Sequence, residues 1–364
     1  MEVLALNAFR SVYRGRRVLV TGHTGFKGSW LSLWLHTLGA EVAGLALDPS
    51  TEPSHWDLLK LPIKDHRVDI RDEPAVSRVL AEERPEIVFH LAAQPLVRRS
   101  YREPVTTWGT NVMGTVHVLE AVRHTPDVRA VVVVTSDKCY ENRERPWAYR
   151  EQDRLGGHDP YSASKAATEL VSASYRAALL QQTSTPLLAT ARGGNVIGGG
   201  DWSEDRLIPD LVRSLVAAEP LVIRSPHATR PWQHVLDLLS GYLLLGQRLL
   251  AGDDTCADPW NFGPEGDGNR TVEQVLGTLS RTWPQLRWEV TSTPQPHEAA
   301  LLQLDSAKAK VHLGWRPVWD FEKAVHHTGV WYRRLMETGD VPSADQLSAY
   351  VADAADSQQV WATT

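Results

Sequence analysis

Short apolar runs alternate with longer helical stretches over the first half of the chain. The runs at 17–22, 41–47, 86–93, 130–136 and 186–192 are nearly all apolar, as strands that are covered by helices on both faces should be. Helical stretches lie between them, at 28–39, 73–83, 107–123 and 162–181. Alternation of this kind indicates an α/β fold, in which a doubly wound parallel sheet is joined by right-handed crossovers.

The character of the sequence changes after residue 193. The segment GGNVIGGGDW (193–202) is glycine-rich, and prolines, tryptophans and short helical stretches dominate beyond it. We interpret 1–198 as one domain, with later strand and helix contributions from about 232–264. Residues 199–364 are interpreted as a smaller, mixed C-terminal lobe that binds the substrate. The polar tail after Met336 is assigned no function.

The bulk composition narrows the classes of partner. A chain of 364 residues with 42% hydrophobic content can bury a sizeable core. The formal net charge of -6 argues against binding nucleic acid or an anionic membrane through bulk charge. No apolar run approaches the roughly 20 residues that cross a bilayer. A small molecule is therefore the expected partner.

The cysteines and histidines of the chain indicate its cellular compartment and whether it binds a metal. Cys139 and Cys256 are the only cysteines, too few for a disulfide framework, which suits a reducing cytoplasm. The 14 histidines form no HxxH or HExxH pattern. We predict a cytoplasmic protein with no structural or catalytic metal.

The segment VTGHTGFKG (20–28) joins the first predicted strand to the first predicted helix. It places Gly22, Gly25 and Gly28 where the backbone can approach a pyrophosphate at the helix N-terminus. Asp48 ends the second strand, where a carboxylate can bind ribose hydroxyls and would repel a 2′-phosphate. The pattern predicts a Rossmann site for NAD rather than NADP. The alternative is that the glycines are ordinary turn residues. Further residues expected at the cofactor are Thr24, Phe26, Lys27, Asp69, Ile70, Leu91, Ala92, Ala93 and Asn111.

Two further segments carry candidate chemistry. In YSASK (161–165), Tyr161 and Lys165 would share one helix face, and the lysine cation would lower the pKa of the phenol from about 10 towards neutrality. In TSDKCYEN (135–142), Asp137 and Lys138 place an acid beside a base at the end of a strand. The alternatives without a catalytic role are a solvated tyrosine and lysine in the first segment and a surface ion pair in the second.

Taken together, TGHTGFKG, Asp48, HLAAQ, TSDKCYEN, YSASK, RGGNVIGGGDW and RPWQHV resemble the extended short-chain dehydrogenase/reductase superfamily. Within it they resemble the CDP-glucose 4,6-dehydratase family, from about residue 14 to about residue 332. The resemblance implies a lyase of deoxysugar biosynthesis. It would convert CDP-D-glucose to CDP-4-dehydro-6-deoxy-D-glucose and water, by internal hydride transfer through tightly bound NAD.

The resemblance also implies roles for the candidate residues. Tyr161 would take the hydroxyl proton at sugar carbon 4 while hydride leaves that carbon for NAD, with Lys165 holding the nicotinamide ribose and Ser136 bonded to the 4-oxygen. Asp137 would protonate the hydroxyl that leaves carbon 6. Lys138 would accept the carbon 5 proton or stabilise the enolate. Relatives that act on dTDP-glucose carry Asp-Glu here, so the Asp-Lys pair leaves the carbon 5 base open.

The expected substrate-binding residues are inferred from the same resemblance. Arginines suit a diphosphate, because the guanidinium fork pairs with two oxygens at once. The residues expected at the nucleotide sugar are Gln94, Asn195, Arg206, Arg230, His297 and Glu298. Relatives also imply a homodimer that pairs through helices near 107–123 and 162–181.

Three rival functions stay open. A nucleotide-sugar 4-epimerase shares the glycine loop, Ser136 and the Tyr161–Lys165 pair, but it has no use for an acid and base at 137 and 138. A 4,6-dehydratase for another nucleoside diphosphate sugar is the second rival, since spacing does not reveal the base. A non-catalytic NAD-binding sensor is the third, and retention of Tyr161 and Lys165 in helical register speaks against it.

Overall fold

The computed structural model describes residues 7–180, 186–291 and 301–362. Seven strands form the central sheet in the order β11-β6-β5-β4-β1-β2-β3, and each neighbouring pair is parallel. The strands are β1 (Arg17–Thr21), β2 (Glu41–Ala46), β3 (Lys64–Arg67), β4 (Ile87–His90), β5 (Ala130–Val134), β6 (Leu187–Gly193) and β11 (Pro259–Phe262). The predicted doubly wound parallel Rossmann sheet is confirmed.

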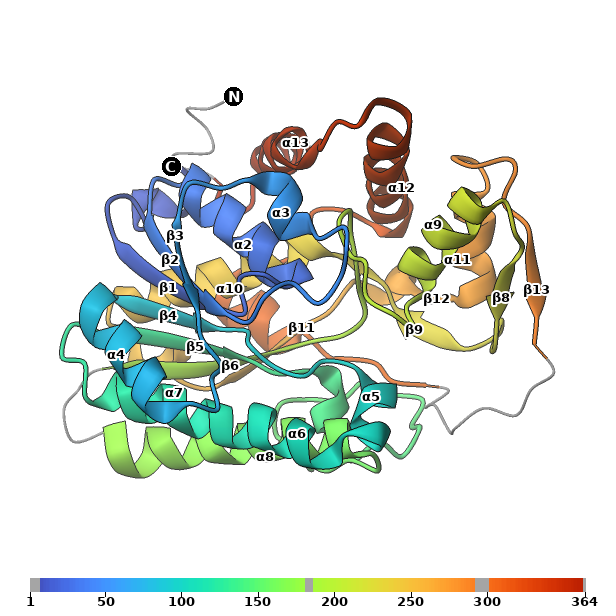
Figure 1. Cartoon of the computed structure of the whole chain (residues 1–364). Helices are drawn as coiled ribbons and strands as arrows, with labels where there is room; N and C mark the ends of the chain where they lie inside the picture. Colours follow the sequence, from blue (N-terminus) through green and yellow to red (C-terminus); the bar gives the residue numbers. More distant parts are fainter. Residues whose placement is uncertain (1–6, 181–185, 292–300, 363–364) are drawn as a thin grey trace.

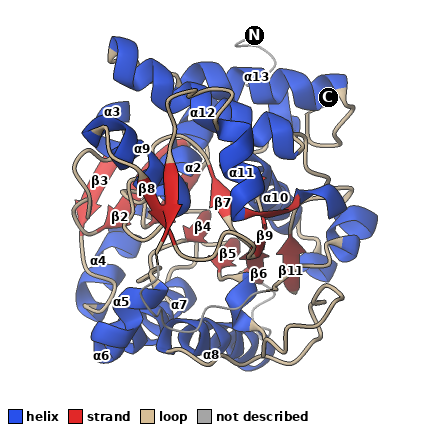
Figure 2. Ribbon diagram, turned by 90° about the vertical axis from the view of Figure 1, so that its right-hand side faces the viewer, coloured by secondary structure: helices blue, strands red, loops and turns tan. Residues whose placement is uncertain are grey.

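Helices cover both faces of this sheet (Figures 1 and 2). One face carries α2 (Phe26–Thr37) and α10 (Val235–Leu250), and the other carries α4 (Glu73–Glu83), α7 (Gly114–Arg123) and α8 (Pro160–Ser174). Along β1, Val18 and Val20 pack in the core cluster that includes α2 and α10, whereas Leu19 packs in the cluster with α4 and α7. Alternate residues of one strand thus face two apolar layers, which explains the apolar runs in the sequence.

The edge strand β3 was not among the predicted strands. Its four residues, Lys64–Arg67, are all polar or charged. Three of these four residues are exposed, so this strand needs no apolar run. The hydrophobic pattern therefore could not reveal it.

Short helices connect the sheet to the other layers. They are α3 (His55–Leu59), α5 (Val97–Arg102), α6 (Pro104–Trp108) and the turns η1 (Ala8–Ser11), η2 (Gly109–Met113), η3 (Asp137–Cys139), η4 (Tyr175–Leu180), η6 (Asp254–Cys256), η7 (Gly266–Gly268) and η8 (Ala309–Leu313). The α6, η2 and α7 segments run on from one another, so the helix predicted at 107–123 begins earlier, at Pro104.

The second half of the chain builds a smaller lobe from two-stranded sheets and helices, on the right of Figure 1. Its strands pair as β7 (Val196–Ile197) with β10 (Gln233–His234), β8 (Leu221–Ile223) with β13 (Trp288–Val290), and β9 (Thr229–Pro231) with β12 (Asn269–Thr271). Its helices include α9 (Leu207–Ala217) and α11 (Val272–Leu279).

The C-terminal helices return to the first half of the chain. These are α12 (Phe321–Thr338) and α13 (Ser343–Asp356), and α13 packs on α2. Beyond α13, the ring of Trp361 stacks on Phe9 with centroids 5.0 Å apart. The tail after Met336 thus covers the Rossmann sheet's helical layer rather than the small lobe. The division of the chain at residue 198 stays a prediction.

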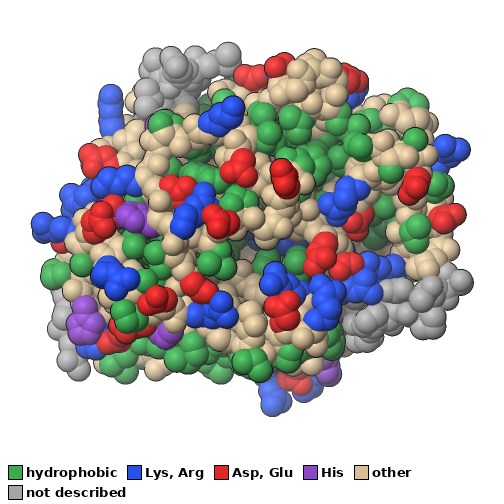
Figure 3. Space-filling view, in the orientation of Figure 1, with side chains coloured by type: hydrophobic (Ala, Val, Ile, Leu, Met, Phe, Trp, Pro, Cys, Tyr) green, Lys and Arg blue, Asp and Glu red, His purple; other side chains and the backbone are tan. Residues whose placement is uncertain are grey.

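Charges of both signs are interspersed over the face drawn in Figure 3. Over residues 7–180, 186–291 and 301–362, no helix combines the length and the apolar character that crossing a membrane requires.

Candidate active site

A cavity of about 980 Å³ lies at the carboxyl ends of the central strands. Its wall includes Gly22 after β1, Leu91 after β4, Thr135 after β5 and Gly193 at the end of β6. β1 pairs with both β2 and β4, so the chain order reverses there. Open α/β sheets bind ligands at such a switch point.

The glycine loop fits a dinucleotide pyrophosphate. Gly22 has φ +75°, and a Cβ there would lie 2.7 Å from the backbone N of Ala92. A Cβ on Gly28 would lie 2.1 Å from the carbonyl O of Gly22. Gly25 lines the cavity, and a Cβ there would lie 3.4 Å from the same carbonyl O, an ordinary contact. Gly25 also precedes α2 without a side-chain cap, which leaves the first helical N–H groups for an anion.

Most of the residues predicted at the cofactor line this cavity. Asp48 does so with 88% of its side chain exposed, 3.7 Å from the Nη1 of Arg67. Its carboxylate is therefore accessible to ribose hydroxyls. The other predicted residues on the wall are Thr24, Phe26, Lys27, Asp69, Ile70, Leu91, Ala92 and Ala93.

Asn111 and Gln94 use their side-chain amides in hydrogen bonds within the protein. Asn111 is buried and is not part of the cavity wall. Its Oδ1 accepts from the backbone N of Gln94 at 2.7 Å, and its Nδ2 donates to Ser164 Oγ at 2.8 Å. Gln94 reaches the wall, but its amide binds Leu96 and Thr107. Both amides thus hold the chain, Asn111 through its bond to Ser164 of α8, and their contact with a ligand stays a prediction.

The helix α8 carries the tyrosine and lysine of YSASK on one face. Its start is set by Asp159, whose Oδ1 accepts from the backbone N of Ser162 at 2.9 Å. Tyr161 and Lys165 are both buried on the cavity wall. The Nζ of Lys165 donates to the carbonyl O of Val134 at 3.3 Å.

The electrostatics of this pair depend on burial. Burial lowers the pKa of Lys165 to about 8, against the charge of Glu169, which raises it. Burial raises the pKa of Tyr161 to about 12, against a hydrogen bond with Ser136, which lowers it. The predicted shift of the tyrosine pKa towards neutrality is therefore not produced by the protein side chains alone, because desolvation of the phenolate outweighs their help.

Asp137 and Lys138 lie on the turn η3, which follows β5. The Oγ of Ser136 donates to Asp137 Oδ1 at 2.8 Å and accepts from the backbone N of Lys138 at 3.2 Å. Asp137 is only 2% exposed, and within the described residues its buried Oδ2 has no hydrogen-bond partner. Lys138 is half-buried on the cavity wall. Burial of Asp137 argues against the surface ion pair that the sequence left open.

Lys27 was predicted as a cofactor-binding residue of the glycine loop. The structure places its ammonium among the charges of Arg206, Lys165, Asp137 and Asp201. The pKa of Lys27 is lowered to about 7, mainly by burial and next by the charges of Arg206 and Lys165, whereas the two carboxylates raise it. The loop therefore brings a titratable amine to the catalytic end of the cavity.

Several of the residues predicted at the nucleotide sugar also line this cavity. Asn195, Arg206 and Arg230 all line the cavity. The Nη1 of Arg206 pairs with Asp201 Oδ2 at 2.9 Å. His297 and Glu298 lie outside the described residues.

Sequence reasoning missed a charged cluster on this wall. Arg98 and Arg224 both pair with Asp205, the first at 2.8 Å. All three line the cavity, although they come from α5, the segment after β8 and the loop before α9. The one signal in the sequence was the arginine doublet that follows HLAAQ closely, at 98–99.

A group of side chains with metal-ligating atoms lies elsewhere, on β3 and α4. His66, Glu82 and Glu83 bring ligand atoms within 4.8 Å of one another. The carboxylate of Glu83 already accepts from Lys64 Nζ at 2.8 Å and from His66 Nε2 at 2.9 Å. These ion pairs explain the cluster, and the absence of a metal stays a prediction.

The parallel sheet, the glycine loop at its switch point and the tyrosine and lysine on α8 define an extended short-chain dehydrogenase/reductase. A family model described as GDP-mannose 4,6 dehydratase matches residues 19–328. The chain belongs to this family of nucleotide-sugar 4,6-dehydratases.

Individual similar proteins include two 4,6-dehydratases and one 4-epimerase. The CDP-glucose 4,6-dehydratase of Salmonella typhimurium is 45% identical, over 94% of this chain and 98% of the relative. A dTDP-glucose 4,6-dehydratase of Xanthomonas campestris pv. campestris is 29% identical, over 86% and 92%. The structure of a UDP-glucose 4-epimerase from Thermus thermophilus in complex with NAD is 27% identical, with TM-score 0.75, over 87% and 99%. The family resemblance expected from the motifs is confirmed.

Proposed function

We propose that the protein converts CDP-D-glucose to CDP-4-dehydro-6-deoxy-D-glucose and water, with NAD as its cofactor. The observation that carries the proposal is the buried carboxylate of Asp137, whose Oδ2 is unpartnered within the described residues. It lies on the same cavity wall as Tyr161 and Lys165. Removal of a sugar hydroxyl needs such an acid, in addition to the oxidising site that epimerases share.

The cofactor is NAD, held by the glycine loop, the N-terminus of α2 and Asp48. When bound, NAD accepts hydride from sugar carbon 4 and later returns it to carbon 6. The accessible Asp48 carboxylate favours a free ribose 2′-hydroxyl over a 2′-phosphate.

Different side chains of the cavity carry out the separate proton transfers of the reaction. Tyr161 takes the proton of the 4-hydroxyl, Ser136 donates to the same oxygen, and Lys165 orients the cofactor ribose and stabilises the phenolate. The 4-ketone makes the carbon 5 proton acidic. Lys138 accepts that proton or stabilises the enolate, and Asp137 protonates the hydroxyl that leaves carbon 6 as water.

CDP as the nucleotide is supported by the 45% identical relative, whose name specifies CDP-glucose. It is also supported by the pair Asp137–Lys138, because the dTDP-glucose branch is expected to carry Asp-Glu at these positions. Arg206, Arg230 and Asn195 line the wall where the diphosphate would lie.

Incubation of the purified protein with CDP-glucose tests this function. We expect a product with the ultraviolet absorbance that 4-keto-6-deoxy sugars develop in base. Parallel incubations with UDP-, dTDP- and GDP-glucose test the base. A keto sugar formed faster from one of these would overturn CDP, and a product that is still a fully hydroxylated hexose would favour the 4-epimerase.

The role of Lys138 needs a separate experiment. We expect Lys138→Ala to abolish exchange of the carbon 5 proton with solvent and to leave hydride transfer from carbon 4 intact. If the exchange is unchanged, Lys138 is not the base, and its role is to stabilise the enolate electrostatically.

We also propose that two copies pair through the helices of the lower layer in Figure 1. Hydrophobic side chains are visible along the lower edge of Figure 3, and large apolar side chains of these helical segments are exposed. They are Val105, Trp108, Met113, Leu170 and Leu179. Light scattering should give twice the chain mass for the natural protein and the single mass for Leu170→Glu. A cytoplasmic location is proposed from the two free, buried cysteines.

A further inference from the structure

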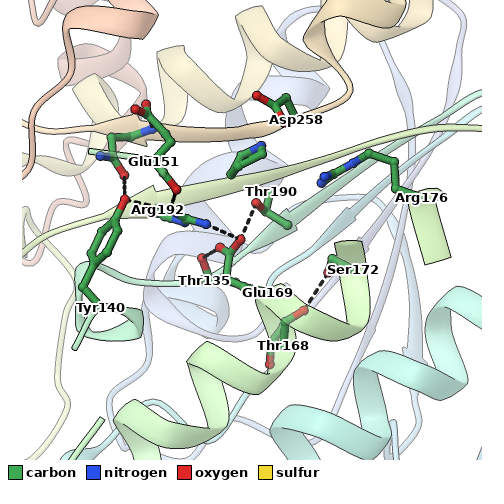
Figure 4. A network of polar contacts seen from close by, with 12 residues as sticks. Thr135, Tyr140, Glu151, Thr168, Glu169, Ser172, Arg176, Thr190, Arg192 and Asp258 are labelled. Carbon is green, nitrogen blue, oxygen red and sulfur yellow. Dashed lines mark hydrogen bonds and ion pairs between the residues drawn. The ribbon is translucent and has the colours of Figure 1, made fainter. Parts of the chain in front are cut away.

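A buried ion pair lies behind the active site, outside the part of the molecule that the proposed mechanism uses. Arg192 of β6 and Glu169 of α8 are 2% and 4% exposed, and Arg192 Nη2 lies 2.8 Å from Glu169 Oε2. Neither residue lines the cavity. Figure 4 shows the pair at the centre of a network of polar side chains.

The network holds the beginning of the segment that carries Asp137 and Lys138. The hydroxyl of Thr135 donates to Glu169 Oε1, and the hydroxyl of Thr190 donates to Glu169 Oε2 at 2.7 Å. Thr135 directly precedes Ser136. The carboxylate of Glu169 therefore joins the end of β5 to β6 and α8 (Figure 4).

The same network holds the other end of that segment. Arg192 Nη1 donates to the hydroxyl O of Tyr140 at 2.7 Å and to the carbonyl O of Glu151 at 3.0 Å. The hydroxyl of Tyr140 donates in turn to Asn261 Oδ1 at 2.8 Å. Tyr140 immediately follows the turn η3, so its phenol anchors the far end of the turn to the guanidinium.

We propose that the Glu169–Arg192 pair positions Asp137 and Lys138 for the elimination of water, by holding the residues on both sides of their turn. This inference rests on the proposed function. A buried ion pair contributes little net stability compared with apolar side chains of similar size. Its value lies in orientation, because hydrogen bonds to charged groups are short and directional. Glu169 and Arg192 touch no reacting atom. They hold the turn through Thr135 and Tyr140, and the charge of Glu169 also raises the pKa of Lys165.

The step affected is the loss of water from the 4-keto sugar. The proton on carbon 5 goes to the base, the hydroxyl on carbon 6 leaves with the proton of Asp137, and a carbon–carbon double bond forms. A turn held at one end only would let the acid and base drift from these two positions. The earlier hydride transfer depends on Tyr161 and Lys165 of α8, whereas the hydroxyl of Tyr140 bonds to Arg192 and Asn261 instead.

Tyr140→Phe tests the proposal, because it removes one hydroxyl from the network and leaves the ring. In rapid mixing with CDP-glucose, the near-ultraviolet absorbance of reduced cofactor should rise at the natural rate and then persist. Formation of the keto sugar should slow by about tenfold or more, the effect of losing a hydrogen bond to a charged group. The matched control is Tyr149→Phe. Tyr149 stacks on Tyr140, with centroids 5.2 Å apart, but its hydroxyl accepts from the backbone N of Arg143 instead.

A second pair of variants keeps the test decisive if Tyr140→Phe does not fold. Thr135→Val removes the donor to Glu169, and Thr135→Ser retains it. We expect reduced cofactor to accumulate in the first and not in the second. Equal slowing of hydride transfer and elimination, or no slowing of either, would overturn the positioning role. Failure of the natural protein to form a keto sugar from CDP-glucose would instead overturn the proposed function.

Discussion

The cavity has two sides that differ in the chemical groups they present to a ligand. The glycine side (the loop at 22–28, Asp48 and Leu91–Ala93) presents mainly backbone and small side chains, together with the exposed carboxylate of Asp48 and the ammonium of Lys27. The charged side (Arg98, Asp205, Arg206 and Arg224) presents long side chains that pair with carboxylates of the same wall. Between them, Tyr161, Lys165 and Asp137 are buried.

The difference shows how one fold can keep its oxidising chemistry while the substrate varies. The glycine positions tolerate almost no substitution, since a Cβ on Gly22 or Gly28 would overlap other backbone atoms. An ion-paired arginine, in contrast, can be substituted by another residue without displacing the backbone. We therefore expect substitutions of Gly22 or Gly28 to abolish cofactor binding. Substitutions on the charged side should change substrate affinity gradually, one ion pair at a time.

The largest expected effect follows from Gly28→Ala. The new Cβ would lie 2.1 Å from the carbonyl O of Gly22, so the loop must open. We expect the purified variant to carry no NAD and to show no activity, measured by the cofactor released on denaturation. Gly277→Ala is the matched control. Gly277 lies in α11, where a Cβ would meet no other described element within 4 Å, and an alanine there should stabilise the helix by about 0.5–1 kcal/mol. Retention of NAD by Gly28→Ala would refute the backbone argument.

Lys165→Met should abolish turnover and yet stabilise the protein. Because the pKa of Lys165 is about 8 in the fold against an ordinary 10.5, its buried charge destabilises the fold fully below pH 8. This penalty fades as pH rises from 8 to 10.5. Chemical denaturation should therefore show the variant more stable by up to about 3 kcal/mol at pH 7, and the gain should disappear near pH 10.5. A gain that does not vary with pH would point to packing instead.

Arg98→Met should weaken the charged side alone. It removes one cation that pairs with Asp205 at 2.8 Å on the cavity wall. We expect the KM for the nucleotide sugar to rise about tenfold, equivalent to about 1.4 kcal/mol, with the content of bound NAD unchanged. Arg281→Met serves as the control, because its pair with Glu322 is exposed and outside the cavity. Loss of NAD in Arg98→Met would show that the two sides are not independent.

Asp48→Asn should produce the smallest change. The carboxylate is 88% exposed, so water and salt screen its charge. We expect the preference for NAD over NADP to fall by only a few-fold, measured as the ratio of the two dissociation constants in protein freed of its cofactor. An unaltered ratio would remove Asp48 from the determinants of cofactor choice.

Much of the Rossmann half could be predicted from the sequence, because its signals lie close together along the chain. The central strands and the helix that carries Tyr161 and Lys165 follow from periodicity and capping over a few residues. The polar strand β3 could not be recognised in this way, since its side chains are mostly exposed and it has no apolar run. The same holds for the cluster of Arg98, Asp205 and Arg224, whose members are more than 100 residues apart at the extremes.

The sequence by itself determined the local geometry: the α/β alternation, the glycine loop and the register of Tyr161 with Lys165. Only the tertiary structure decided the charge environment. It raised the pKa of Tyr161 instead of lowering it, brought Lys27 to Asp137, and placed the Glu169–Arg192 pair behind the catalytic turn. The reason is that periodicity reports which face of one element is buried. A pKa or an ion pair depends on which charges, and how much low-dielectric packing, the crossovers bring together from distant segments.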